Sequence, residues 1–92
     1  MAKPSNEDGV ILALIKRFER QRLPRLRELR QKVDRGEVLG SRDIEFLSMV
    51  IHDAQHSKHL IDKHPEWQSF CAYVVHLHET ITERALQNQK DL

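Results

Sequence analysis

Apolar side chains recur at every third or fourth position along most of the chain, which is the period of an amphipathic α-helix rather than of a strand. The first such stretch predicts a helix over residues 7–35. Pro24 lies inside it, lacks a backbone donor and crowds the preceding turn, so we expect a kink or a break between Arg20 and Leu23. Because the apolar stripe resumes on the same side, one kinked helix is predicted instead of two. The stripe consists of Ile11, Leu14, Ile15, Phe18, Leu26, Leu29 and Val33.

Two further helices are predicted, over residues 42–63 and 65–89. Gly36 ends the first helix, and the Ser41 hydroxyl can cap the second. The second helix ends before Pro65, because proline disfavours a helical residue before it and suits the first turn of the next helix. The apolar stripe of the second helix is Ile44, Leu47, Val50, Ile51, Ala54 and Ile61, and that of the third is Trp67, Phe70, Val74, Leu77, Ile81 and Ala85.

These patterns predict an all-α chain. Three amphipathic helices with short connections favour an antiparallel three-helix bundle. The bundle forms a single domain over residues 1–92, with a polar lead over residues 1–6. Dimerisation of two such bundles would give a larger helical bundle.

The composition is that of a small folded protein. Of 92 residues, 39% are hydrophobic and 32% are charged, so a core can form but a deep enclosed active site cannot. The single cysteine, Cys71, cannot form an internal disulfide. The N-terminal residues lack the apolar segment of a secretion signal, and no apolar run nears the roughly 20 residues that span a bilayer. We therefore expect a cytoplasmic protein without a membrane partner.

A row of histidines is the most distinctive chemical feature. His52, His56 and His59 follow Glu45 at spacings that place all four on one face of the second helix. This face lies opposite the apolar stripe, so these histidines are not expected in the core. Imidazole binds metal ions and titrates near neutral pH. We interpret the row first as a solvated or partner-covered face, second as a metal site and third as a pH-sensitive interface.

A metal site on this row would need ligands from other elements. His52 and His56, or His56 and His59, can converge on one ion, but the whole row extends about 10 Å along the helix axis. The remaining ligands would have to come from the third helix. Zinc, nickel, iron and copper are the candidate ions, and no other cofactor is expected.

Charge is segregated along the chain. Residues 16–35 hold nine Lys or Arg against three acidic residues, a net charge of +6, whereas the whole chain carries +1. Such a helix can bind nucleic-acid phosphates. The near-neutral total and the few aromatic residues favour pairing with the acidic helices instead, within the chain or across a dimer. The basic face consists of Lys16, Arg20, Arg27 and Arg30.

No motif in the sequence indicates catalysis, and we expect a binding or assembly module that self-associates rather than an enzyme. Self-association is expected because the helices carry more apolar side chains than their main stripes need. Phe46, Met49 and Leu60 lie off the main stripe, near the histidine side, and predict a second buried seam between copies. A separate protein partner is a further option. The two alternative functions are metal binding by the histidine row and nucleic-acid binding by the basic face.

Overall fold

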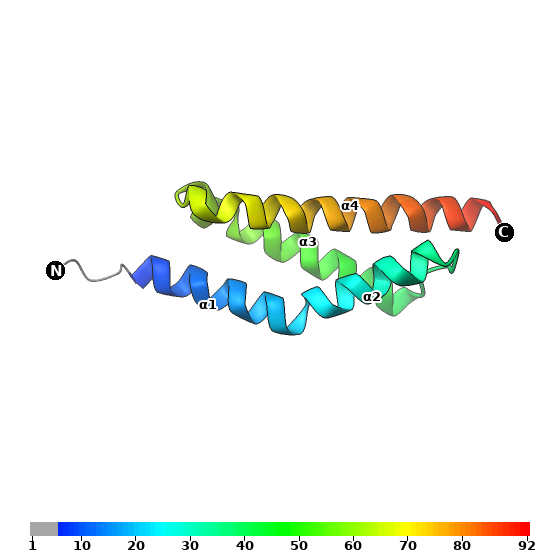
Figure 1. Ribbon diagram of the computed structural model, residues 1–92, viewed down its shortest axis with the longest axis horizontal. Coiled ribbons are helices and arrows are strands. Elements are labelled where there is room, and N and C mark those ends of the chain that lie inside the picture. Colours follow the sequence, from blue (N-terminus) through cyan, green and yellow to red (C-terminus); the bar gives the residue numbers. More distant parts are fainter. Residues whose placement is uncertain (1–5) are drawn as a thin grey trace.

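The computed structural model describes residues 6–92, and every regular element in this range is a helix, which confirms the all-α prediction. The elements are α1 (Asn6–Gln21), α2 (Leu23–Asp34), α3 (Ser41–Asp62), the 3₁₀ turn η1 (Pro65–Trp67) and α4 (Gln68–Lys90). α1 and α2 follow one another in one direction, α3 returns, and α4 runs in the direction of α2 (Figure 1). Within the described range, no helix is both long and apolar enough to cross a membrane.

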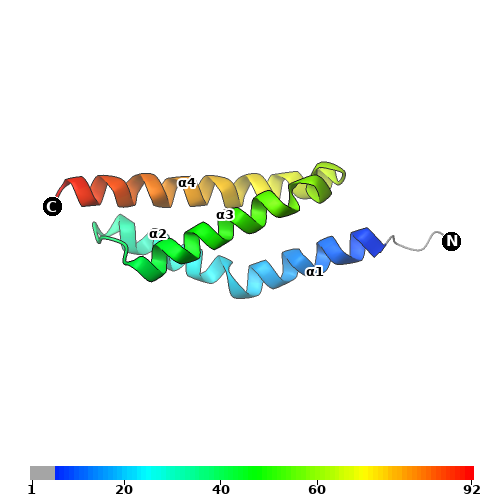
Figure 2. The ribbon, with the colours of Figure 1, turned by 180° about the vertical axis from the view of Figure 1, so that it is seen from behind.

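The described range contains four α-helices, so the expected three-helix bundle is not confirmed. Arg22 separates α1 from α2, where one kinked helix was predicted. The Arg22 N–H still donates to the Phe18 carbonyl (2.9 Å), and the Leu26 N–H donates to the Arg22 carbonyl (3.0 Å). Pro24 has no N–H to offer the Arg20 carbonyl, and the chain bends at this point, as Figure 2 shows from behind.

The turn after α2 confirms the prediction that Gly36 ends this helix. Gly36 has φ of +84°, which L side chains rarely adopt. Its N–H donates to the Val33 carbonyl (3.0 Å), and the Glu37 N–H donates to the Lys32 carbonyl (3.2 Å). The Asn88 amide of α4 then donates to the Val33 and Glu37 carbonyls at 2.8 and 3.0 Å. This turn is therefore fastened to the end of α4.

The start of α3 differs from the prediction that Ser41 caps it. Ser41 is the first helical residue, and Gly40 precedes it. The cap is supplied by Asp43, whose carboxylate accepts the Gly40 N–H at 3.1 Å and the Lys32 ammonium at 2.9 Å. The Lys32 hydrogen bond, opposed by partial burial and helped by the Gly40 N–H, holds the pKa of Asp43 below its ordinary value. The Asp43 carboxylate caps α3 instead of the Ser41 hydroxyl, because the carboxylate also binds the Lys32 ammonium of α2.

The third predicted helix begins later than expected. Pro65 opens a 3₁₀ turn instead of an α-helix, and the Trp67 N–H donates to the His64 carbonyl at 3.0 Å. The α-helical geometry of α4 starts at Gln68.

The main core lies between α2, the first half of α3 and the middle of α4. Its members are Leu23, Leu26, Leu29, Val33, Leu39, Phe46, Leu47, Val50, Val74, Leu77 and Ile81. The His78 ring nitrogen Nε2 lies 2.9 Å from the Leu47 carbonyl and ties α4 to α3. Ile44, expected in the core, is 57% exposed. The buried face of α3 is rotated away from it because α2 and α4 contact α3 from two sides.

Candidate functional site

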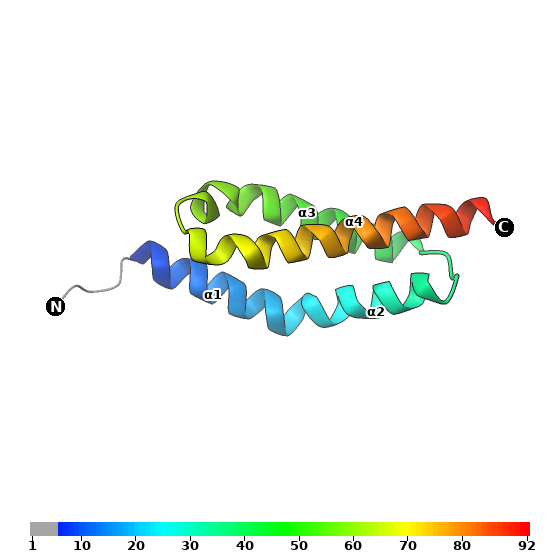
Figure 3. The same ribbon diagram turned by 45° about the horizontal axis from the view of Figure 1, so that its top comes forward.

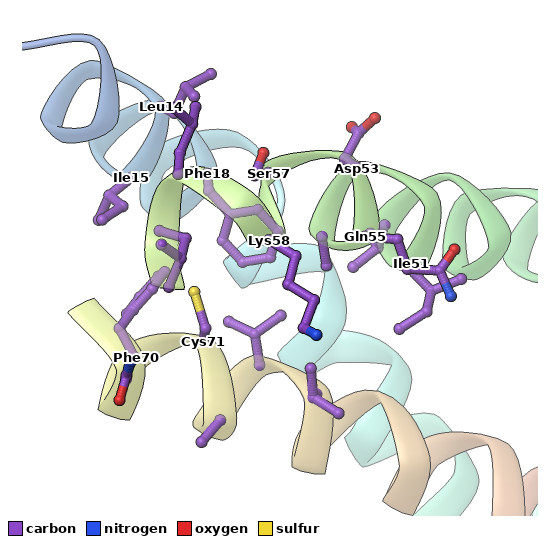
Figure 4. Close-up of a pocket in the computed structure, with 18 of the residues that line it drawn as sticks. Leu14, Ile15, Phe18, Ile51, Asp53, Gln55, Ser57, Lys58, Phe70 and Cys71 are labelled. Carbon is purple, nitrogen blue, oxygen red and sulfur yellow. The ribbon is translucent and has the colours of Figure 1, made fainter. Parts of the chain in front are cut away.

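An open apolar groove occupies one end of the molecule. It lies between α1, the second half of α3 and the first half of α4, and has a volume of about 590 Å³. Figure 4 shows side chains of all three helices directed into this space, with Lys58 on the α3 wall and Cys71 on the α4 wall. A volume of this size falls within the range of sites that bind molecules or peptide segments.

The groove exists because α1 is packed less closely than α2. From Gly9 onward in α1, where burial is described, the buried side chains are Ile11 and Ile15, and neither belongs to the main core. Phe18 adds an edge-to-face contact with Phe70 of α4, with ring centroids 6.0 Å apart. The bend at Pro24 separates the directions of α1 and α2, so α1 does not continue the close packing of α2 on α4 (Figure 3).

Apolar side chains that remain in contact with water line this groove. Leu14 of α1 is 43% exposed. Ile51 and Ile61 of α3 and Val75 of α4 are only half-buried, although such residues are usually core residues. These side chains form a contiguous apolar surface rather than scattered single residues, which is typical of an interaction site.

The rim of the groove is polar and has little net charge. Arg22 at the α1–α2 junction forms an ion pair with Asp53 of α3. Lys58 Nζ lies 4.0 Å from the Asp62 carboxylate. Opposite charges are therefore present in equal numbers, and the groove does not select a strongly charged ligand. The charged residues of its lining are Arg17, Arg22, Asp53, Lys58, Asp62 and Glu79.

Cys71 is the single cysteine of the chain, and its side chain is half-buried in the groove wall. Burial raises the pKa of its thiol above the ordinary value. A thiol with a raised pKa is a poor nucleophile at neutral pH. Its raised pKa and its place in the wall fit an apolar wall residue.

The histidine row lies on the outer face of α3, away from the groove. His52, His56, His59 and Glu45 are all exposed. The His52 and His56 rings stack with centroids 5.4 Å apart. In the described residues, no group of three or more His, Cys, Asp or Glu side chains is placed to hold a metal ion. The metal interpretation stays a prediction that elemental analysis of untagged protein would test.

The three predicted interface residues have different positions. Phe46 is 6% exposed, inside the chain's own core, and the Arg25 guanidinium lies 4.4 Å from its ring centroid. Its assignment to a surface between copies is therefore wrong, because α2 and α4 together bury a wider arc of α3 than one neighbouring helix would. Met49 is 44% exposed, and the half-buried Leu60 lines the groove.

The predicted basic face is divided between solvent and internal ion pairs. Lys16, Arg20 and Arg27 are exposed. Arg30 instead donates from Nε to Asp34 at 3.1 Å. Arg27 and Arg30 also line a second, smaller pocket between α2 and α4. Sequence reasoning identified these two arginines but not their neighbours on α4, since helical periodicity does not say which faces of two helices meet.

Comparison with known proteins gives no assignment: no family model, curated protein or solved structure matches this chain.

Proposed function

We propose that this protein is an assembly module in which two copies bury each other's apolar groove. The observation that carries the proposal is the groove of about 590 Å³ whose wall includes the partly exposed Leu14. Covering such surface is favourable by about 25 cal/mol for each Å² of apolar area removed from water. The pairing would extend the bundle by helices of the second copy.

The occupant we assign is α1 of the second copy, because this helix carries apolar side chains that its own chain leaves exposed. α1 carries the exposed apolar residues Val10, Leu12 and Leu14 beside its buried ones. Its 16 residues extend about 24 Å, and the α1 side of the groove, from Ile11 to Arg22, extends about 17 Å, so one such helix is long enough to span the groove. Each copy therefore offers both a groove and a ridge, as a two-fold symmetric interface requires.

The test is the molar mass in solution, measured by size-exclusion chromatography with light scattering. We expect the wild type to show twice the 10.9 kDa of one chain. Leu14→Glu should give a monomer with unchanged helical circular dichroism. A buried leucine contributes about 1.5–3 kcal/mol and each dimer loses two, so the dimer Kd should rise at least about 100-fold.

Leu86→Glu is the matched control. Leu86 is 58% exposed on α4 and does not line the groove, so this variant should dimerise like the wild type. A wild type that stays monomeric up to about 1 mM would refute self-association. Equal loss of dimer in both variants would place the interface elsewhere.

A further inference from the structure

The second pocket lies between α2 and α4, separate from the apolar groove except for one shared residue, His76. Its volume is about 290 Å³, just below the roughly 300–1,000 Å³ that is typical of small-molecule sites. The lining residues are Arg27, Arg30, Gln31, Tyr73, His76 and Leu77.

Two pairs of side chains, one from each helix, contribute to the lining of this pocket. Arg27 and Arg30 are three residues apart on α2, and Tyr73 and His76 are three residues apart on α4, so each pair lies on one helix face. The floor is Leu77, which is 6% exposed and belongs to the main core. The pocket is therefore built on the closely packed end of the molecule, where its side chains are held on rigid elements.

The electrostatics of the pocket favour an anion. No carboxylate is among its lining residues. Within residues 6–92, Arg27 forms no ion pair, and Arg30 uses only Nε for its bond to Asp34, which leaves its two terminal nitrogens available. Asp34 is itself shared, because Arg84 Nε lies 3.6 Å from it. One carboxylate thus faces two guanidinium groups, and Arg27 adds a further positive charge.

We propose that this pocket binds a phosphate group joined to a planar ring, as in a nucleoside monophosphate. The guanidinium groups of Arg27 and Arg30 match the geometry of phosphate oxygens, and Gln31 and His76 add hydrogen-bonding groups. Tyr73 is 46% exposed and offers a ring face on which a base can stack. This inference does not depend on the proposed assembly.

The test is a titration of the uniformly ¹⁵N-labelled full chain with adenosine monophosphate at constant ionic strength, followed by NMR chemical shifts. We expect saturable shifts centred on the backbone amides of the lining residues. Arg27→Gln should weaken binding at least about 10-fold, because a charge-assisted hydrogen bond to phosphate is lost. Tyr73→Leu should weaken adenosine monophosphate about 5-fold or more and leave inorganic phosphate unchanged, because only the ring loses its partner.

Arg20→Gln is the control, since it removes the same charge from the basic face outside the pocket. It should change the Kd less than about twofold. A short single-stranded oligonucleotide distinguishes the source of the nucleotide: tighter binding than adenosine monophosphate at the same residues identifies a strand end, and weaker binding identifies a free nucleotide. Both results support the pocket chemistry.

Three results would overturn the proposal. The first is the absence of saturable shifts up to about 10 mM ligand. The second is an equal loss of affinity in Arg20→Gln and Arg27→Gln, which would show a diffuse basic surface instead of a site. The third is an unchanged affinity for adenosine monophosphate in Tyr73→Leu, which would show that the pocket does not recognise the planar ring of the ligand. Circular dichroism of each variant verifies that it is folded.

Discussion

Asp43 connects three parts of the fold through one carboxylate. It caps the start of α3 through the Gly40 N–H, accepts the Lys32 ammonium from α2, and lies 3.8 Å from the Arg25 guanidinium. Only 17% of its side chain is exposed, so these interactions are less screened than those of a surface ion pair. The connection between α2 and α3 consequently depends on Asp43 being ionised.

This dependence predicts a contribution of Asp43 to acid unfolding. Its pKa is lowered in the folded state, mainly by the Lys32 hydrogen bond. The stabilisation is therefore fully present above the pKa that Asp43 has in the unfolded state, about 3.9. It is lost as the pH falls through the lower pKa that Asp43 has in the folded state. Asp43→Asn should cost about 1–2 kcal/mol at pH 7 and should flatten the decline of stability below about pH 4.

Urea denaturation from about pH 7 to pH 2.5 measures both effects. Glu83→Gln is the control, because Glu83 is exposed and forms no ion pair in the described part of the chain. An Asp43→Asn protein with the same decline below pH 4 as the wild type would assign acid sensitivity to other carboxyl groups.

At the scale of elements, two glycines have opposite roles: Gly9 lies inside a helix and Gly36 follows the end of one. Gly36 adopts φ of +84° and ends α2, a conformation that side chains other than glycine adopt at a cost. Gly9 lies inside α1, and a Cβ added to it would meet nothing within 4 Å. Glycine inside a helix lowers its stability relative to alanine.

The same substitution at these two positions should therefore change stability in opposite directions. Gly36→Ala is expected to lower the free energy of unfolding by about 1 kcal/mol or more. Gly9→Ala is expected to raise it by as much as about 1 kcal/mol. Thermal and urea unfolding of the two variants beside the wild type measures the signs. A destabilised Gly9→Ala would contradict this prediction, and an unchanged free energy of unfolding would show that α1 unfolds separately from the rest of the chain.

The whole molecule has a closely packed end and an open end. The main core joins α2, α3 and α4, whereas α1 closes the other end with Ile11, Ile15 and the edge contact of Phe18. Local stability follows buried apolar contact, so opening of α1 should need less free energy than opening of α2. The open end is also where the proposed second copy would add the missing contacts.

Hydrogen exchange should show this difference directly. In dilute protein, we expect backbone amides of α1 to exchange at least about 10-fold faster than those of α2, because fewer buried contacts resist their opening. Raising the protein concentration should slow α1 selectively, since dimerisation removes the groove from water. Hydrogen exchange followed by mass spectrometry at two protein concentrations measures both effects. Equal protection of α1 and α2 in the dilute sample would contradict the unequal packing.

The helical nature of the chain, its inward residues in outline and the glycine end of α2 follow from local rules of periodicity and turn geometry, whereas the division of the first predicted helix at Arg22 does not. These rules act between residues close in sequence, and so Gly36 and the exposed histidine row could be predicted. They do not say which helix faces touch. Packing between the four helices, close in some places and loose in others, decides four features: burial of Phe46 instead of Ile44, the capping of α3 by Asp43, the groove beside Leu14 and the pocket that Arg27 and Tyr73 both line. These features depend on contacts between residues distant in sequence, because the bend at Pro24 and the packing of neighbouring helices set how far each helix is rotated and covered.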